Sequence, residues 1–186
     1  MSLNQAASEL FLQQIDSIVD EYGVSREQAF LRWICENILD LSEEGKIDEA
    51  VSIDGKDDRG VDIFHYESSG DEIDQYVSWI QAKFSNTLDH VVTREEIRDF
   101  GHTIGDLESC PLEANNIFKQ KSSEFIQLGG VESRIRKRMY FVCSGILNAQ
   151  AKELINSNEW KQQVIDNLSG PPIEFEVIDI DNILSH

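Results

Sequence analysis

Apolar residues recur at helical spacing in the first part of the chain. They do so over residues 6–22, and the pattern stops at Gly23, which suits the C-terminal cap of a helix. Ser25 then stands three residues before Gln28, the spacing of a capping box at the start of a second helix. The sequence therefore predicts two consecutive amphipathic helices at the N-terminus.

The next strong pattern is a pair of strands. Residues Val61–Tyr66 and Tyr76–Phe84 are rich in β-branched and aromatic side chains, and they flank the polar segment Glu67–Gln75. This arrangement is typical of a β-hairpin with a long loop. If Tyr66 faces Tyr76 or Val77, the residue pair at the other end of the hairpin brings Asp62 opposite Ile80 or Gln81.

The remaining patterns predict further helices and strands. The acidic stretch 42–50 is expected to be a loop or a frayed helix end, and Ala50–Ile53 a short strand. Thr93 and Glu96 form a second capping box, which opens a helix toward Ile104. Later segments are predicted as helices over 112–128, 147–155 and 158–168, a buried central strand over Met139–Ser144 and a strand with one wet face over Ile173–Ile178.

This order predicts the α/β class, with a central mixed β-sheet flanked by helices. A chain of 186 residues suits one domain, here residues 1–24 as an N-terminal helix and 25–186 as the core. No apolar run approaches the ~20 residues needed to span a bilayer, and the N-terminus lacks the pattern of a signal peptide. Three widely spaced cysteines favour reduced thiols over disulfides or zinc, so we expect a cytoplasmic protein. Because no apolar run is long enough to span a bilayer, we expect no membrane partner.

The formal net charge of −19 opposes long-range attraction to nucleic acid. The basic residues are unevenly spread, however, and six of the 16 lie in one strip: Lys119, Lys121, Arg134, Arg136, Lys137 and Arg138. Arg134, Arg136, Lys137 and Arg138 are the candidate nucleic-acid-binding residues. A solvated polar face without a partner is the alternative interpretation of the same strip.

Three side chains at one end of the hairpin could carry chemistry. Gln81 and Lys83 share a face of their strand because side chains alternate, and Asp62 is expected beside them. A carboxylate with neighbouring oxygens can hold Mg²⁺ or Mn²⁺, and a lysine can orient a water or neutralise charge on a phosphate. A structural ion pair at the end of a sheet would give the same spacing.

Other constellations are weaker. His65 is expected on the face opposite Asp62, and Cys143 lies in a strand of buried type, which favours a core position over a nucleophile. The sequence contains no phosphate-binding glycine loop, dinucleotide fingerprint or G-x-S-x-G elbow.

The segment Arg59-Gly-Val-Asp62, followed after a polar loop by Gln81-Ala-Lys83, resembles the signature of the PD-(D/E)XK nuclease superfamily. It is similar to the variant with glutamine before the lysine, as in Mrr-like restriction endonucleases. More narrowly, it resembles the N-terminal nuclease domain of abortive-infection phage-resistance (AIPR) proteins. The resemblance implies a restriction-endonuclease-like fold and extends from the second helix onward.

By this resemblance the protein would be a Mg²⁺- or Mn²⁺-dependent endonuclease in prokaryotic phage defence or restriction. Its substrate would be DNA, with RNA as the less favoured alternative. Asp62 would bind the metal, Gln81 would replace the usual acid as a neutral ligand, and Lys83 would be the catalytic lysine. Related nucleases often add a glutamate from an N-terminal helix, for which Glu36 is the candidate. Its place at the edge of the apolar stripe of the second helix is equally that of an ordinary solvent-facing glutamate.

The resemblance also bears on partners. AIPR proteins are usually longer, so the chain corresponds to a nuclease domain, a short relative, or a partner of a larger defence protein. Cutting both strands of a duplex would favour a homodimer. The alternative function is a catalytically inactive module of the same fold that binds a protein or nucleic-acid partner.

Overall fold

The computed structural model describes residues 3–56, 60–68, 75–109, 112–127, 136–166 and 173–185. Its helices are α1 (Leu3–Tyr22), α2 (Arg26–Asn37), α3 (Glu44–Val51), α4 (Arg94–Ser109), α5 (Asn116–Gln127), α6 (Ala149–Ile155), α7 (Asn158–Asp166) and α8 (Ile180–Ile183). Its strands are β1 (Ile63–Ser68), β2 (Gln75–Lys83), β3 (Val91–Val92), β4 (Arg136–Cys143), β5 (Ile146–Leu147) and β6 (Ile173–Ile178).

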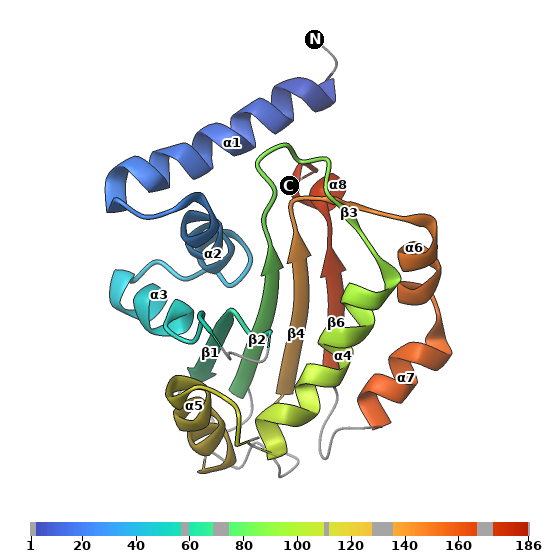
Figure 1. Cartoon of the computed structure of the whole chain (residues 1–186). Helices are drawn as coiled ribbons and strands as arrows, with labels where there is room; N and C mark the ends of the chain where they lie inside the picture. The colour runs from blue at the N-terminus through green and yellow to red at the C-terminus, as the bar shows by residue number, and fades with distance from the viewer. Residues whose placement is uncertain are drawn as a thin grey trace.

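A mixed four-stranded sheet in the order β1-β2-β4-β6 forms the centre of the protein (Figure 1). Strand β1 runs antiparallel to β2, whereas β2, β4 and β6 are mutually parallel. The carboxyl ends of β2, β4 and β6 therefore meet at one end of the sheet, and β1 begins there. The α/β class with a mixed sheet flanked by helices is confirmed and is consistent with a restriction-endonuclease-like fold.

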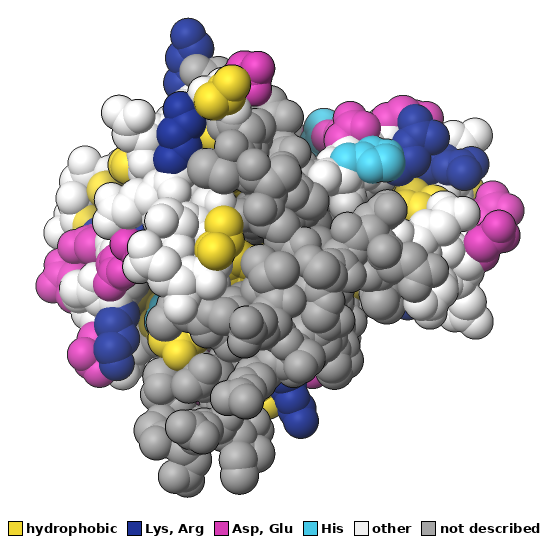
Figure 2. Space-filling view, turned by 90° about the horizontal axis from the view of Figure 1, so that it is seen from below, with side chains coloured by type: hydrophobic (Ala, Val, Ile, Leu, Met, Phe, Trp, Pro, Cys, Tyr) yellow, Lys and Arg dark blue, Asp and Glu magenta, His cyan; other side chains and the backbone are white. Residues whose placement is uncertain are grey.

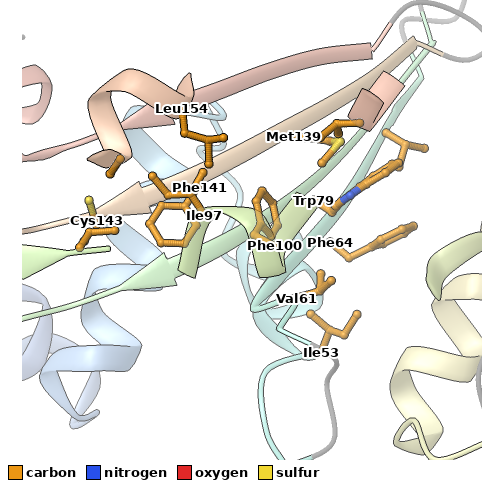
Figure 3. Close-up of a cluster of buried hydrophobic side chains, with 14 of the residues drawn as sticks. Ile53, Val61, Phe64, Trp79, Ile97, Phe100, Met139, Phe141, Cys143 and Leu154 are labelled. Atoms are coloured by element: carbon orange, nitrogen blue, oxygen red, sulfur yellow. The ribbon is translucent and has the colours of Figure 1, made fainter. Parts of the chain in front are cut away.

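Two layers of helices cover the two faces of the sheet. Helices α4 to α7 pack on one face, where Trp79, Met139 and Phe141 belong to the same buried cluster as Phe100 of α4 (Figure 3). The rings of Phe100 and Phe141 lie with their centroids 5.9 Å apart. Burial of each such large apolar side chain contributes about 1.5–3 kcal/mol to folding. We call this the α4–α7 face.

Helices α1 to α3 and α8 cover the opposite face, around Ile80 and Val142. Helix α2 starts with the expected capping box, in which Gln28 N–H donates to Ser25 and Ser25 N–H donates to the Gln28 side chain. Gly23 adopts φ +65° and ends α1 as predicted. No helix within the described ranges is long and apolar enough to cross a membrane.

The hairpin is confirmed with one of the two expected registers, in which Tyr66 faces Val77. Strand β4 is the predicted central strand, and β6 is the predicted Ile173–Ile178 strand. Two predictions are wrong. Residues 44–51 form helix α3 rather than a loop, because Ile47 and Ala50 pack into the core, and no strand covers residues 50–53.

Candidate active site

Asp62 lies immediately before β1, against the backbone of β2. Its N–H donates to the carbonyl of Ile80 at 2.9 Å, and its carboxylate oxygen Oδ2 accepts from the N–H of Ala82 at 2.6 Å. These two bonds bracket Gln81, so the half-buried carboxylate is fixed beside that residue. The prediction that Asp62 comes opposite Ile80 or Gln81 is confirmed.

Gln81 and Lys83 lie on the α4–α7 face. Val77 and Trp79 of the same strand are buried in the cluster on that face, and side chains two residues apart share a face. In β4, the register partners of Gln81 and Lys83 are Phe141 and Cys143, which belong to the same cluster. Both polar side chains are half-buried at the carboxyl end of β2, where open α/β sheets commonly bind ligands.

An open hollow of about 500 Å³ lies next to Lys83. Lys83, residues 84–87, His90 and Glu96 line it. Glu96 belongs to the confirmed capping box of α4, and its carboxylate accepts from Thr93 N–H at 2.8 Å. Burial by itself would raise the pKa of Glu96, but hydrogen bonds from Thr93 and from His90, 3.4 Å away, lower it below the usual value. The sequence predicts the capping box of Thr93 and Glu96, but it gives no sign that Glu96 and His90 line a hollow beside Lys83.

Glu36 does not share this environment. It is exposed on α2, a helix that packs on the face opposite Gln81 and Lys83. Partial burial and the nearby carboxylate of Glu21 raise its pKa, and Arg32 opposes that shift. The expectation that Glu36 reaches Asp62 therefore finds no support, because the packing of α2 directs its apolar stripe, not Glu36, toward the sheet.

The predicted basic strip is not a continuous surface. Lys137 is fully buried with its ammonium 5.3 Å from the centroid of the Phe125 ring, which corrects its assignment as a surface contact. Lys121 is also buried, and its ammonium lies 2.7 Å from a carboxylate oxygen of Glu49. Both lysines have inward positions because the elements that carry them pack on the core.

Arg136 and Arg138 lie at the start of β4, at the end of the sheet away from Lys83. The Arg138 guanidinium lies 3.6 Å from the centroid of the Tyr76 ring, and Arg136 donates to the Tyr76 hydroxyl. Arg134 falls outside the described residues. Figure 2 views this end of the molecule, where the Lys and Arg side chains of the described residues fall in several separate places, some of them beside acidic ones.

The competing nucleophiles and bases are core or packing residues. Burial raises the pKa of both the Cys35 and Cys143 thiols to about 12, so neither is a thiolate at neutral pH. Half-buried His65 pairs with Ser78 in the register, on the face opposite Gln81. The predicted core position of Cys143 and the predicted face of His65 are confirmed, while Cys110 lies in a part of the chain that the structure leaves undescribed.

The donor set allows a test of the expected metal. No three His, Cys, Asp or Glu side chains within the described ranges come together as a metal site. Mg²⁺ can nevertheless be held by one carboxylate together with waters and substrate phosphates. In such an arrangement the Asp62 carboxylate and the Gln81 carboxamide would be the protein's oxygen donors. Comparison of the chain with family models, curated proteins and solved structures gives no match.

Proposed function

We propose that this protein is a metal-dependent nuclease that cleaves phosphodiester bonds in DNA, in a context of prokaryotic phage defence or restriction. One observation carries the proposal: the Asp62 carboxylate is fixed beside Gln81, two residues before Lys83, at the carboxyl end of β2. An acid, an amide and an amine are thereby gathered at an open end of the sheet, next to a hollow that can admit substrate.

Each side chain has a task in this proposal. Asp62 and Gln81 would supply oxygen ligands to Mg²⁺ or Mn²⁺. The bound ion would provide Lewis-acid polarisation of the scissile phosphate and a water of lowered pKa. Lys83 would orient the attacking water and neutralise the charge that develops on the phosphate oxygens. Because Asp62 is fixed against β2, its position relative to Gln81 and Lys83 would stay constant.

Cleavage of labelled single- and double-stranded DNA and RNA tests the proposal. The assay compares Mg²⁺, Mn²⁺ and chelator for the wild type, Asp62→Asn, Lys83→Ala and the control Lys152→Ala, which alters an exposed lysine of α6. We expect metal-dependent cutting of DNA that both site variants lose by at least about 100-fold and the control retains. Cutting that survives both site substitutions would rule the assignment out.

A catalytically inactive module that binds a partner is the second candidate. Two observations favour it: one Asp62 oxygen already accepts a backbone hydrogen bond, and Glu36 lies on the other face. Calorimetric titration of the protein with Mn²⁺, with and without an oligonucleotide, separates the two. The nuclease proposal expects metal binding that strengthens when nucleic acid is present, whereas the inactive module expects no metal binding in either case.

A further inference from the structure

Apart from Lys83, the residues that line the hollow beside it have no task in the proposed cleavage. The groups in it that are able to donate hydrogen bonds to an anion include the Lys83 ammonium, the Asn86 amide and the His90 ring. Arg26 donates to Asn86 Oδ1 at 3.0 Å, so the acceptor atom of that amide is engaged and its NH₂ group remains as the donor. A hollow of this chemistry suits a phosphate.

The loop that forms the hollow is fastened at both ends by the segment after β4. At the first end, Ser85 N–H donates to Ser144 Oγ at 2.7 Å, and Ser144 N–H donates to the Lys83 carbonyl at 3.0 Å. At the second end, Ile146 N–H donates to the His90 carbonyl at 2.8 Å. The donors of the hollow therefore have a fixed spacing relative to Lys83.

The same loop holds a residue in an uncommon backbone conformation. Leu88 has φ +56°, a region that non-glycine residues seldom adopt. Its side chain packs against the core cluster on the face opposite the α4–α7 face. Such conformations cost about 1–3 kcal/mol and persist where the surroundings impose them, often at ligand sites. The strain is consistent with a loop whose shape is kept for binding.

Glu96 lines the hollow and Asp89 lies in the loop beside it, and both acids have partners of their own. The Glu96 carboxylate accepts from Thr93 and lies 3.4 Å from a ring nitrogen of His90. Asp89 accepts from the Thr87 hydroxyl. Their charges are thus partly offset by hydrogen bonds, and Lys83 adds a cation to which no carboxylate among the described residues lies within ion-pair distance.

We propose that this hollow is a subsite for a backbone phosphate of the nucleic-acid substrate, adjacent to the phosphate that is cleaved. The inference rests on the proposed function, because it takes the substrate to be a polymer that passes Lys83. It assigns substrate contacts to Asn86 and His90, which hold one neighbouring phosphate so that the next reaches Asp62 and Lys83.

Binding without cleavage tests this subsite. Fluorescence anisotropy of a short labelled single-stranded DNA, in chelator, gives the dissociation constant for the wild type, Asn86→Asp and His90→Ala. Asn86→Asp keeps the acceptor for Arg26 but replaces the donor amide by a negative charge. His102→Ala is the matched control, since His102 is an exposed histidine of α4 outside the hollow. Thermal unfolding checks that each variant is folded.

We expect binding about 10-fold weaker or more for Asn86→Asp, several-fold weaker for His90→Ala, and no change for His102→Ala. Equal affinity of all four proteins, or no binding by the wild type, would overturn the subsite. Displacement of the DNA by a mononucleotide at equal phosphate concentration would overturn it in favour of a small nucleotide. Weakened binding in the two variants without cleavage by the wild type would retain the subsite and remove the nuclease.

Discussion

At the scale of single residues, Asp62 has a structural task as well as a proposed chemical one. Its Oδ2 accepts from the Ala82 N–H at 2.6 Å, a bond that joins the start of β1 to β2. Loss of a half-buried hydrogen bond of this kind costs about 1–3 kcal/mol. The two tasks need different properties of the side chain: the bond needs an oxygen acceptor, and the metal needs a negative charge.

Asp62→Asn and Asp62→Ala therefore should behave differently. Urea unfolding should show Asp62→Ala less stable by about 1–3 kcal/mol, while Asp62→Asn stays within about 1 kcal/mol because its amide oxygen can accept the same bond. Cleavage should fall at least about 100-fold in both. Near-normal cleavage by Asp62→Asn would mean that the charge is not required and would remove Asp62 from the metal site.

The pH dependence of stability should depend in part on His65. Burial lowers the pKa of His65 below its ordinary value of 6.5, Glu67 and Glu49 oppose the shift, and Lys46 and Lys121 add to it. The unfolded chain then binds more protons than the native protein as the pH falls below 6.5. Stability from this group is present above that pH and is lost as the pH falls through the lower native pKa.

We expect His65→Gln to flatten the fall of the thermal midpoint between about pH 7 and about pH 5. The exposed His102→Ala is the control, and its midpoints should follow those of the wild type at every pH. An unchanged slope in His65→Gln would show that His65 does not contribute to the acid sensitivity.

Among the helices and strands, the sequence correctly predicts those that are specified by patterns of a few neighbouring residues. The capping boxes at Ser25 and Thr93 and the run Met139–Ser144 each lie within a few residues, and their structures agree. Helix α3 escapes prediction because only Ile47 and Ala50 of its eight residues are buried, too few for a periodic pattern. Strands β3 and β5 are two residues each and exist through their pairing with one another.

For the candidate site too, local sequence determines the positions of some residues and helix packing determines those of others. Alternation along one strand places Gln81 and Lys83 on one face, and the hairpin register places Asp62 beside them, so these positions follow from nearby sequence. The positions of Glu36 and Lys137 depend on how α2 and α5 pack on the sheet. No local pattern reveals that packing, so the sequence alone could not show that Lys137 is buried or that Glu36 lies on the opposite face.

Gly145, in the segment after β4, packs closely against the loop that lines the hollow. A Cβ atom at this position would lie 2.4 Å from the carbonyl oxygen of His90, whose backbone fastens the loop beside Lys83. Gly145→Ala should lower the free energy of unfolding by about 1–3 kcal/mol and displace His90. Gly45→Ala in α3 is the control, because its Cβ meets nothing within 4 Å. Equal stability of the two variants in urea would contradict this account.

At the scale of the whole molecule, the net charge of −19 repels a polyanion at long range. Binding of the proposed nucleic-acid substrate would then depend on a few short-range contacts, of which Lys83 and the loop at Asn86 and His90 are the proposed ones. Arg136 and Arg138 lie at the other end of the sheet and contact Tyr76, so they are poorly placed to extend this set.

The salt dependence of binding should reveal this balance. Each phosphate neutralised by a protein cation changes the logarithm of the association constant by about −0.7 per tenfold increase in salt for single strands. One or two contacts predict a slope between about −0.7 and about −1.4, made shallower because salt also screens repulsion from the acidic surface. Anisotropy titrations over a series of sodium chloride concentrations give the slope. A slope steeper than about −3 would require several more phosphate contacts. Such a slope would indicate that the basic strip also binds nucleic acid, and charge reversal at Arg134, Arg136 and Arg138 should then weaken binding.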